Sequence, residues 1–148
     1  MAQTPFDLDA LRDHTGPRVF ARGEAYAEAG HVDLVQVAED EVVAHVSGTG
    51  TYVVHLTPSS GLGLCTCPAF EDFGTCKHVV ATAVVHNGLN AVEVRAARSR
   101  LARLAEGLEL EDHAALVARV LDLARRIPAV LADLEGAGAR PERLQDPS

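Results

Sequence analysis

The chain of 148 residues contains no tryptophan, and aromatic residues make up only 4% of it. It therefore offers few rings on which nucleic-acid bases could stack. Positive charge is also scarce, because 13 Lys and Arg stand against 21 Asp and Glu, which gives a net charge of −8 at pH 7. A protein that neutralises many phosphates needs a basic excess, so the composition disfavours a general polyanion binder.

Long apolar runs are absent as well. A bilayer-spanning helix needs roughly 18 to 20 consecutive apolar residues, so we expect no membrane association of that kind. The first residues, MAQTPFDLDALRD, have neither the basic nor the apolar region of a signal peptide. We therefore expect a cytoplasmic protein, whose thiols stay reduced. The hydrophobic content of 47% is sufficient for the core of one domain of ordinary size.

The N-terminal half predicts a short helix followed by an antiparallel sheet. The helix covers residues 17–29, with Pro17 in its first turn and Gly30 at its end. Alternating apolar runs separated by turn-forming residues come next, and they predict strands at residues 31–37, 42–47, 51–56 and 63–66. Consecutive strands with short connections form a meander.

The hairpin between the second and third strands determines which residues face each other. Centred on Gly50, it makes Val46 the partner of Val54 and His45 the partner of His55. The alternate apolar residues of both strands then share one buried face, and both histidines lie on the outer face. A solvated histidine pair is the simplest interpretation, and a second metal site or a pH-sensitive pair is the alternative.

The rest of the chain predicts helices, at residues 76–88, 92–108 and 112–134. The first has Thr75 as a candidate N-cap and an apolar sequence typical of a buried helix. The other two carry apolar residues spaced alternately three and four apart, a pattern that lets helices pack together. Pro128 either kinks the last helix or begins a new one.

These elements predict an α+β fold: a short N-terminal helix, an antiparallel β-meander, a finger that leads into a helix, and a C-terminal helical extension. We expect one module at residues 17–88. Residues 89–135 form the extension, which packs on that module or serves in association, including a homodimer through the C-terminal helices. Residues 136–148 predict a flexible tail.

All three cysteines lie in the segment CTCPAFEDFGTCKH. Clustered thiols in a reducing compartment indicate a metal site rather than a disulfide. Cys65 and Cys67, two positions apart on a strand, point to the same side. The following loop reverses the chain, so Cys76 and His78 approach them from the start of the next helix. Three thiolates and one imidazole form a closed tetrahedral set, which predicts one structural Zn²⁺ per chain.

Other interpretations of this cluster remain open. One alternative is a cluster of buried thiols beside a solvated His78, and another is an iron–sulfur centre, which normally takes a fourth cysteine. A catalytic pair of Cys76 and His78 is a third interpretation, but no orienting group or oxyanion site is evident. Nothing else supports an enzyme. Lys77 lies between two of the ligands, and its charge favours ionised thiols.

The pattern Cys65-x-Cys67-x₈-Cys76-x-His78 resembles the SWIM-type zinc finger, whose pattern is CxCxₙCxH. Further positions resemble those of family members: Pro68, Phe70 and the apolar helix after Cys-Lys-His. The upstream residues Arg22-Gly23, Tyr26, Gly30 and Val32 resemble the segment that precedes the finger in bacterial members. The resemblance covers about residues 17–88. It implies a compact β-meander-plus-helix module with structural zinc. It also implies DNA binding or protein–protein interaction, since members occur in transposases, beside helicase-like ATPases and in recombination accessory proteins.

Four arginines form the only basic island of the sequence: Arg95, Arg98, Arg100 and Arg103. On a helical wheel, Arg95, Arg100 and Arg103 lie opposite the leucines, where they can meet phosphates or a partner. A solvated face opposite the core is the alternative interpretation.

Two functions follow from the sequence. In the first, the protein is an interaction adaptor in DNA-associated processes: zinc fixes the module and the helical half presents a docking surface to a protein partner. In the second, Lys77 and the arginine-bearing helix 92–108 bind DNA directly. The acidic net charge favours the first and predicts that any DNA binding is weak.

Overall fold

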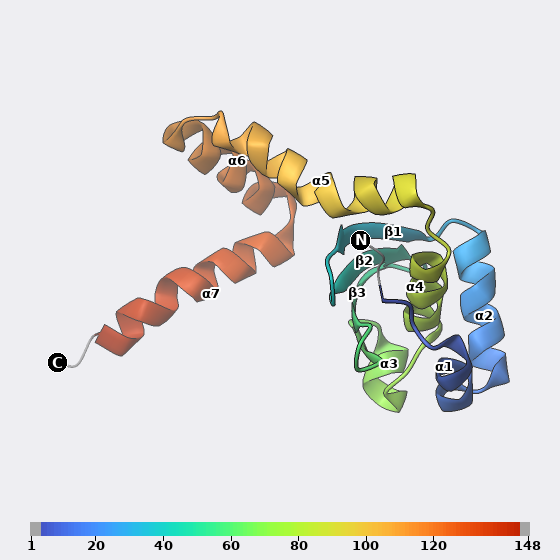
Figure 1. Cartoon of the computed structure of the whole chain (residues 1–148). Helices are drawn as coiled ribbons and strands as arrows, with labels where there is room; N and C mark the ends of the chain where they lie inside the picture. Colours follow the sequence, from blue (N-terminus) through green and yellow to red (C-terminus); the bar gives the residue numbers. More distant parts are fainter. Residues whose placement is uncertain (1–3, 146–148) are drawn as a thin grey trace. The chain divides into compact units, whose positions relative to one another are not determined.

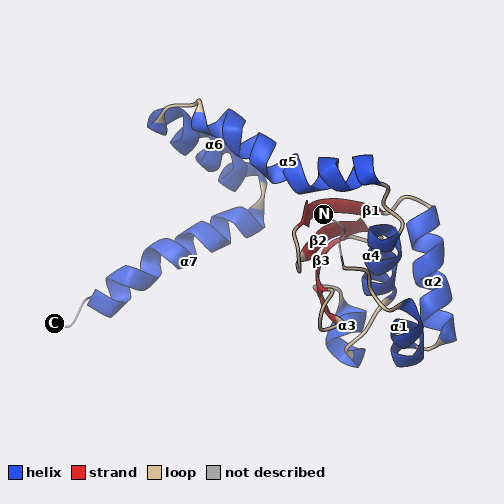
Figure 2. Ribbon diagram, in the orientation of Figure 1, coloured by secondary structure: helices blue, strands red, loops and turns tan. Residues whose placement is uncertain are grey.

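The computed structural model describes residues 4–145, and the side chains of residues 4–136. The fold is α+β, as the sequence predicts (Figures 1 and 2). In chain order its elements are α1 (Leu8–Thr15), α2 (Pro17–Glu28), β1 (Val32–Val37), β2 (Val42–Ser47), β3 (Thr51–Thr57), β4 (Leu62–Cys65), α3 (Pro68–Phe73), α4 (Lys77–Asn87), α5 (Ala91–Glu109), α6 (His113–Arg126) and α7 (Pro128–Gln145). The chain forms two compact units, residues 1–103 and residues 104–148.

The first unit contains a four-stranded antiparallel sheet in the order β1-β2-β3-β4. The predicted meander is therefore confirmed, but its register is wrong by two residues, because Val46 pairs with Tyr52 rather than with Val54. The hairpin centres on Thr49, since the turn 48–50 closes with a 2.7 Å hydrogen bond from its first N–H to its last carbonyl oxygen. A shift of two residues leaves every side chain on its predicted face.

The corrected register separates the two histidines of the outer face. His45 pairs with Val53, and His55 pairs with Val43, so the predicted histidine pair does not form. Both side chains are exposed, and His55 lies 3.9 Å from the carboxylate of Glu41. Neither belongs to a cluster of potential metal ligands among the described residues.

The inner face of the sheet forms the core together with α4. The alternate residues of β2 and β3 are at most 2% exposed, as predicted: Val42, Ala44, Val46, Val54 and Leu56. Helix α4 packs against α2 on one side and against all four strands on the other (Figure 1). This position explains why α4 is apolar nearly all round, because a helix covered on several sides needs no polar face.

Helix α2 approaches α4 most closely at Gly23. A Cβ atom built there would lie 2.3 Å from Cγ1 of Val80 and 3.0 Å from the carbonyl oxygen of Lys77. No real contact is that short, so only glycine permits this crossing of the two helices.

Helix α1 is an element that the sequence analysis misses. The carboxylate of Asp7 caps it by accepting a 3.0 Å hydrogen bond from the N–H of Ala10. Leu8 and Leu11 pack against the core. At the other end Gly16, with φ of 88°, ends α1 and permits α2 to begin at the next residue.

Two helix boundaries also differ from the prediction. Cys76, not Thr75, is the N-cap of α4. Of the two alternatives for Pro128, the structure shows the second: α6 ends at Arg126, Ile127 leaves the helical conformation, and Pro128 begins α7. Helix α7 continues to Gln145 through most of the segment predicted as a tail, and residues 146–148 lie outside the described part of the chain.

In the second unit, α6 contacts α7, and α6 begins with Asp112 as its N-cap. Ala124 is the buried residue of α6, whereas most of the predicted apolar stripe is 39–45% exposed: Val117, Val120, Ile127, Leu131 and Leu134. Within the described residues, none of the helices has the length and apolarity that crossing a membrane requires.

The crossing at Gly23 gives a test of the fold. We expect Gly23→Ala to lower the free energy of unfolding by about 1–3 kcal/mol, because the added methyl group pushes Val80 out of place. Gly107→Ala on α5 is the matched control, since its Cβ meets nothing within 4 Å and should leave stability unchanged or slightly raised. Urea unfolding of the zinc-loaded proteins measures both, and equal midpoints for the parent and Gly23→Ala would contradict the packing described here.

Candidate metal centre

The four predicted ligands come from three consecutive elements. Cys65 is the last residue of β4, and Cys67 is the N-cap of α3. Cys76 is the N-cap of α4, and His78 lies in the first turn of that helix. The segment between Cys67 and Cys76, predicted as a loop, contains the short helix α3 instead.

Helix α3 reverses the chain between the two halves of the site. The thiol of Cys67 caps it by accepting a 3.4 Å hydrogen bond from the N–H of Phe70, and Pro68 occupies its first turn. Gly74, with φ of 72°, ends the helix in the left-handed region. The chain then returns to the sheet, which brings Cys76 beside Cys65.

One ligand atom from each of the four residues lies within 4.8 Å of the other three. Sγ of Cys65 lies 3.8 Å from Nδ1 of His78. Tetrahedral zinc with bonds of about 2.0–2.3 Å holds its ligand atoms about 3.3–3.8 Å apart. If the four ligand atoms move slightly closer together, they can all coordinate one ion.

Burial of the ligands favours zinc rather than free thiols. Cys67, Cys76 and His78 are 2%, 3% and 5% exposed, and Cys65 is 9% exposed. No carboxylate belongs to the set, and three thiolates with one imidazole are the soft and borderline donors that zinc prefers. The site fits a structural zinc ion, held entirely by protein ligands.

The thiols interact strongly with one another. A hydrogen bond from Cys65 lowers the pKa of Cys76 well below its ordinary value, against the opposing effect of burial. Hydrogen bonds from His78 and from the N–H of Val79 act in the same direction. The same thiol pair and burial raise the pKa of Cys65. The hydrogen bond between Cys65 and Cys76 thus makes Cys76 the thiol of this pair that ionises more readily.

Two tyrosines hold the imidazole of His78 in place. The ring of Tyr52 lies 4.9 Å from that of His78, and the ring of Tyr26 lies 5.6 Å from it. Nε2 of His78 is turned toward Gly48, where a Cβ atom would be 3.7 Å away. Contacts that fix a ligating imidazole strengthen a metal site, so Tyr26 on α2 and Tyr52 on β3 belong to its surroundings.

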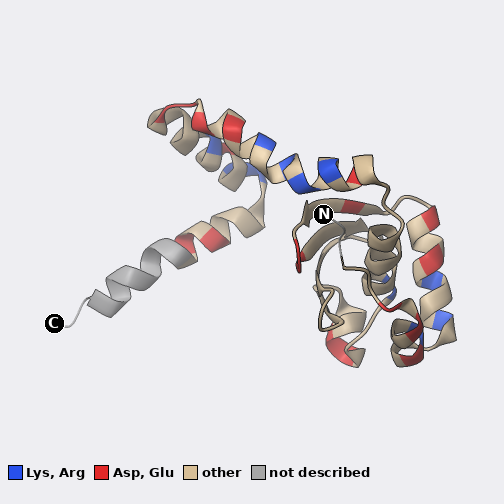
Figure 3. Cartoon of the chain, in the orientation of Figure 1, with Lys and Arg blue, Asp and Glu red and all other residues tan. Residues whose placement is uncertain are grey.

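The residues predicted to contact a nucleic acid or a partner lie in different places, and only Lys77 is next to the metal centre. Lys77 lies beside it, and its ammonium group sits 4.6 Å above the ring of Tyr26. Arg100 on α5 binds the carboxylate of Asp33 at 2.7 Å and the carbonyl oxygen of Leu34 at 2.8 Å. Arg103 donates to the hydroxyl of Ser99, and Arg95 is exposed. Figure 3 shows these basic positions along α5.

Zinc content tests the site directly. We expect about one zinc per chain in protein purified without chelator, and none when Cys67→Ala and Cys76→Ala are combined, because two of four ligands are lost. Elemental analysis by mass spectrometry gives the ratio. Thr66→Ala is the control between two ligands and should keep its zinc. Full zinc content in the double variant would refute the ligand assignment.

Zinc also contributes to folding. Structural zinc in small fingers supplies about 10 kcal/mol, because the site does not exist in the unfolded chain. We expect chelation to unfold residues 61–88 first and to leave the C-terminal helices partly formed. Circular dichroism during titration with chelator follows this loss. A spectrum that stays the same after complete zinc removal would contradict it.

Residues 52–87 match the family model described as the SWIM zinc finger. A search of curated proteins and a search of solved structures each returned no match. The matched segment runs from β3 to the end of α4, so it contains all four ligands together with Lys77 and Tyr52. It does not extend over the upstream part of the predicted resemblance, residues 17–51. The pattern, the geometry and the family match agree: residues 52–87 match the SWIM zinc finger, and their four ligands support one structural zinc ion.

Proposed function

We propose that the protein is an interaction adaptor, and the observation that supports this best is the closed zinc site. All four ligands come from the chain and are buried, which leaves no coordination position for a substrate. The three thiols are all used as ligands, so the proposal includes no catalytic step. Zinc-bound thiolates suit a reducing compartment, and we place the protein in the cytoplasm.

Exposed apolar residues support a docking role for the helical extension. Besides the stripe on α6 and α7, Leu104 is 58% exposed and Leu121 is 53% exposed. Apolar side chains gathered in this way mark surfaces that contact another protein. The partner is a different protein in a DNA-associated process or a second copy of this chain.

Direct DNA binding is the second candidate, because α5 carries four arginines in one helix. Two observations weaken it. Arg100 is already paired with Asp33, so phosphates must compete for it, and Lys77 lies on α4 rather than on the arginine-bearing helix α5. With so few contacts, the slope of log affinity against log salt should be at most about −3 to −4.

An electrophoretic shift titration separates the two candidates. We expect little binding of single- or double-stranded DNA at physiological salt. Arg95→Glu with Arg103→Glu is the informative variant, because both side chains can be reversed without breaking the Arg100–Asp33 pair. A submicromolar complex at physiological salt that this variant loses would reverse our ranking.

The apolar stripe gives a second test of the adaptor. We expect Ile127→Asp with Leu131→Asp to abolish either self-association or partner capture from native extract treated with nuclease, because a charged group cannot be buried in an apolar contact. Light scattering and pull-down measure the two. Leu110→Asp is the control, since that side chain is 90% exposed and lies outside the stripe. A double variant that retains both properties would show that the stripe is not a docking surface.

A further inference from the structure

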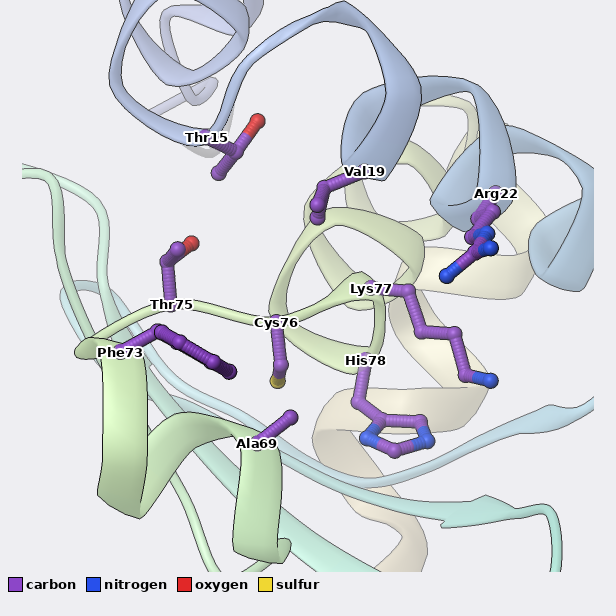
Figure 4. Close-up of a pocket in the computed structure, with 9 residues that line it drawn as sticks. All are labelled: Thr15, Val19, Arg22, Ala69, Phe73, Thr75, Cys76, Lys77 and His78. Carbon is purple, nitrogen blue, oxygen red and sulfur yellow. The ribbon is translucent and has the colours of Figure 1, made fainter.

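A cleft of about 460 Å³ opens beside the metal centre (Figure 4). One wall comes from the end of α1 and the first turns of α2, and the other comes from α3. The segment from Thr75 to His78 forms its floor, so two of the zinc ligands lie directly beneath it.

Most of the surface of this cleft is apolar. Val19 on α2 faces it from one wall, and Ala69 and Phe73 on α3 face it from the other (Figure 4). Phe73 is 78% exposed, among the most exposed large apolar side chains in the first unit. An exposed phenylalanine at the rim of an apolar cleft is a feature of surfaces that take up a side chain of a partner.

The polar groups of the cleft favour a negatively charged partner. Arg22 on α2 and Lys77 on α4 both line the cleft, and both side chains lie on the right in Figure 4. The hydroxyl oxygen of Thr75 is buried without a hydrogen-bond partner. Among the described residues that line the cleft, none is acidic, although the whole chain has a net charge of −8. The cleft is thus a local exception to the charge of the protein.

We propose that this cleft docks an acidic peptide segment of a partner protein. An apolar side chain of the peptide lies between Val19 and Phe73, and a neighbouring carboxylate pairs with Arg22 and Lys77. This inference rests on the proposed adaptor function and names the surface and the chemistry of the partner. Two cations beside an apolar cavity suit one carboxylate and one side chain, whereas a nucleic acid needs a longer basic track for its successive phosphates.

The proposal also gives the zinc ion a role in recognition. Cys76 and His78 hold the floor of the cleft, and α3, which carries Phe73, begins at the ligand Cys67. Zinc therefore fixes the α3 wall relative to the floor before any partner arrives, and the packing of α2 on α4 at Gly23 holds the other wall. A preformed cleft loses less conformational entropy on binding, which favours affinity.

Selection from a random peptide library displayed on phage tests the cleft, with the full-length zinc-loaded protein as bait. We expect the enriched peptides to carry an aliphatic or aromatic residue next to Asp or Glu. A labelled peptide from the selection should then bind roughly tenfold more weakly to Arg22→Glu and to Phe73→Ser by fluorescence polarisation. The zinc content and melting temperature of both variants should equal those of the parent.

Matched controls come from exposed residues outside the cleft. Arg18→Glu reverses an exposed charge on the same helix, and Leu64→Ser removes an apolar side chain that is 64% exposed, but neither residue lines the cleft. Both should bind the peptide like the parent. Enriched peptides without acidic residues, or equal affinity for Arg22→Glu and Arg18→Glu, would overturn the proposal. A DNA oligonucleotide that displaces the peptide at physiological salt would overturn it in favour of nucleic acid.

A pull-down from native extract distinguishes the cleft from the adaptor function. If the parent and the Arg22→Glu, Phe73→Ser double variant both capture a partner that resists nuclease treatment, that result would refute docking at the cleft but would agree with the adaptor function. A partner captured by the parent and lost from this variant, but kept by the Arg18→Glu, Leu64→Ser control, supports both. If no nuclease-resistant partner is captured but selected peptides still bind at the cleft, the result would count against the adaptor function and not against peptide binding at the cleft.

Discussion

The convergence of four side chains on one zinc ion is the constraint on which the first unit depends. Cys65 ends the last strand of the sheet, and Cys76 and His78 begin the most buried helix. The ion therefore joins the edge of the sheet to the helix that fills its inner face. Since each thiolate is buried, loss of the ion would leave the ligands without the charge that stabilises them, and the connection between sheet and helix would weaken.

Helix packing and zinc binding support each other at the start of α4. Gly23 allows α2 to lie directly on α4, and Tyr26, three residues later on α2, contacts His78 and Lys77. The same helix then supplies Val19 and Arg22 to the cleft. One close helix crossing thus positions groups around the metal centre and along the proposed docking surface.

The sequence predicts the elements with a strong local signal and misses those that depend on distant contacts. Period-two apolar runs identify the strands and their buried faces, and the spacing of Cys65, Cys67, Cys76 and His78 identifies the metal site. The predicted hairpin register is wrong because the turn, which contains two glycines, can centre on Thr49 or on Gly50, and both choices bury the same face of the sheet. Helix α1 is short, and only its contacts with the core reveal it. The cleft combines α1, α2, α3 and α4, so no local pattern indicates it.

The central claim is that the zinc site is closed by three thiolates and one imidazole. X-ray absorption spectroscopy at the zinc edge, on the full-length protein in solution, measures the ligand set directly. We expect about three sulfur atoms near 2.3 Å and one nitrogen near 2.0 Å, with no oxygen. Two sulfur atoms or fewer, or an oxygen from water among the ligands, would show an open site and contradict the structural role assigned to the metal.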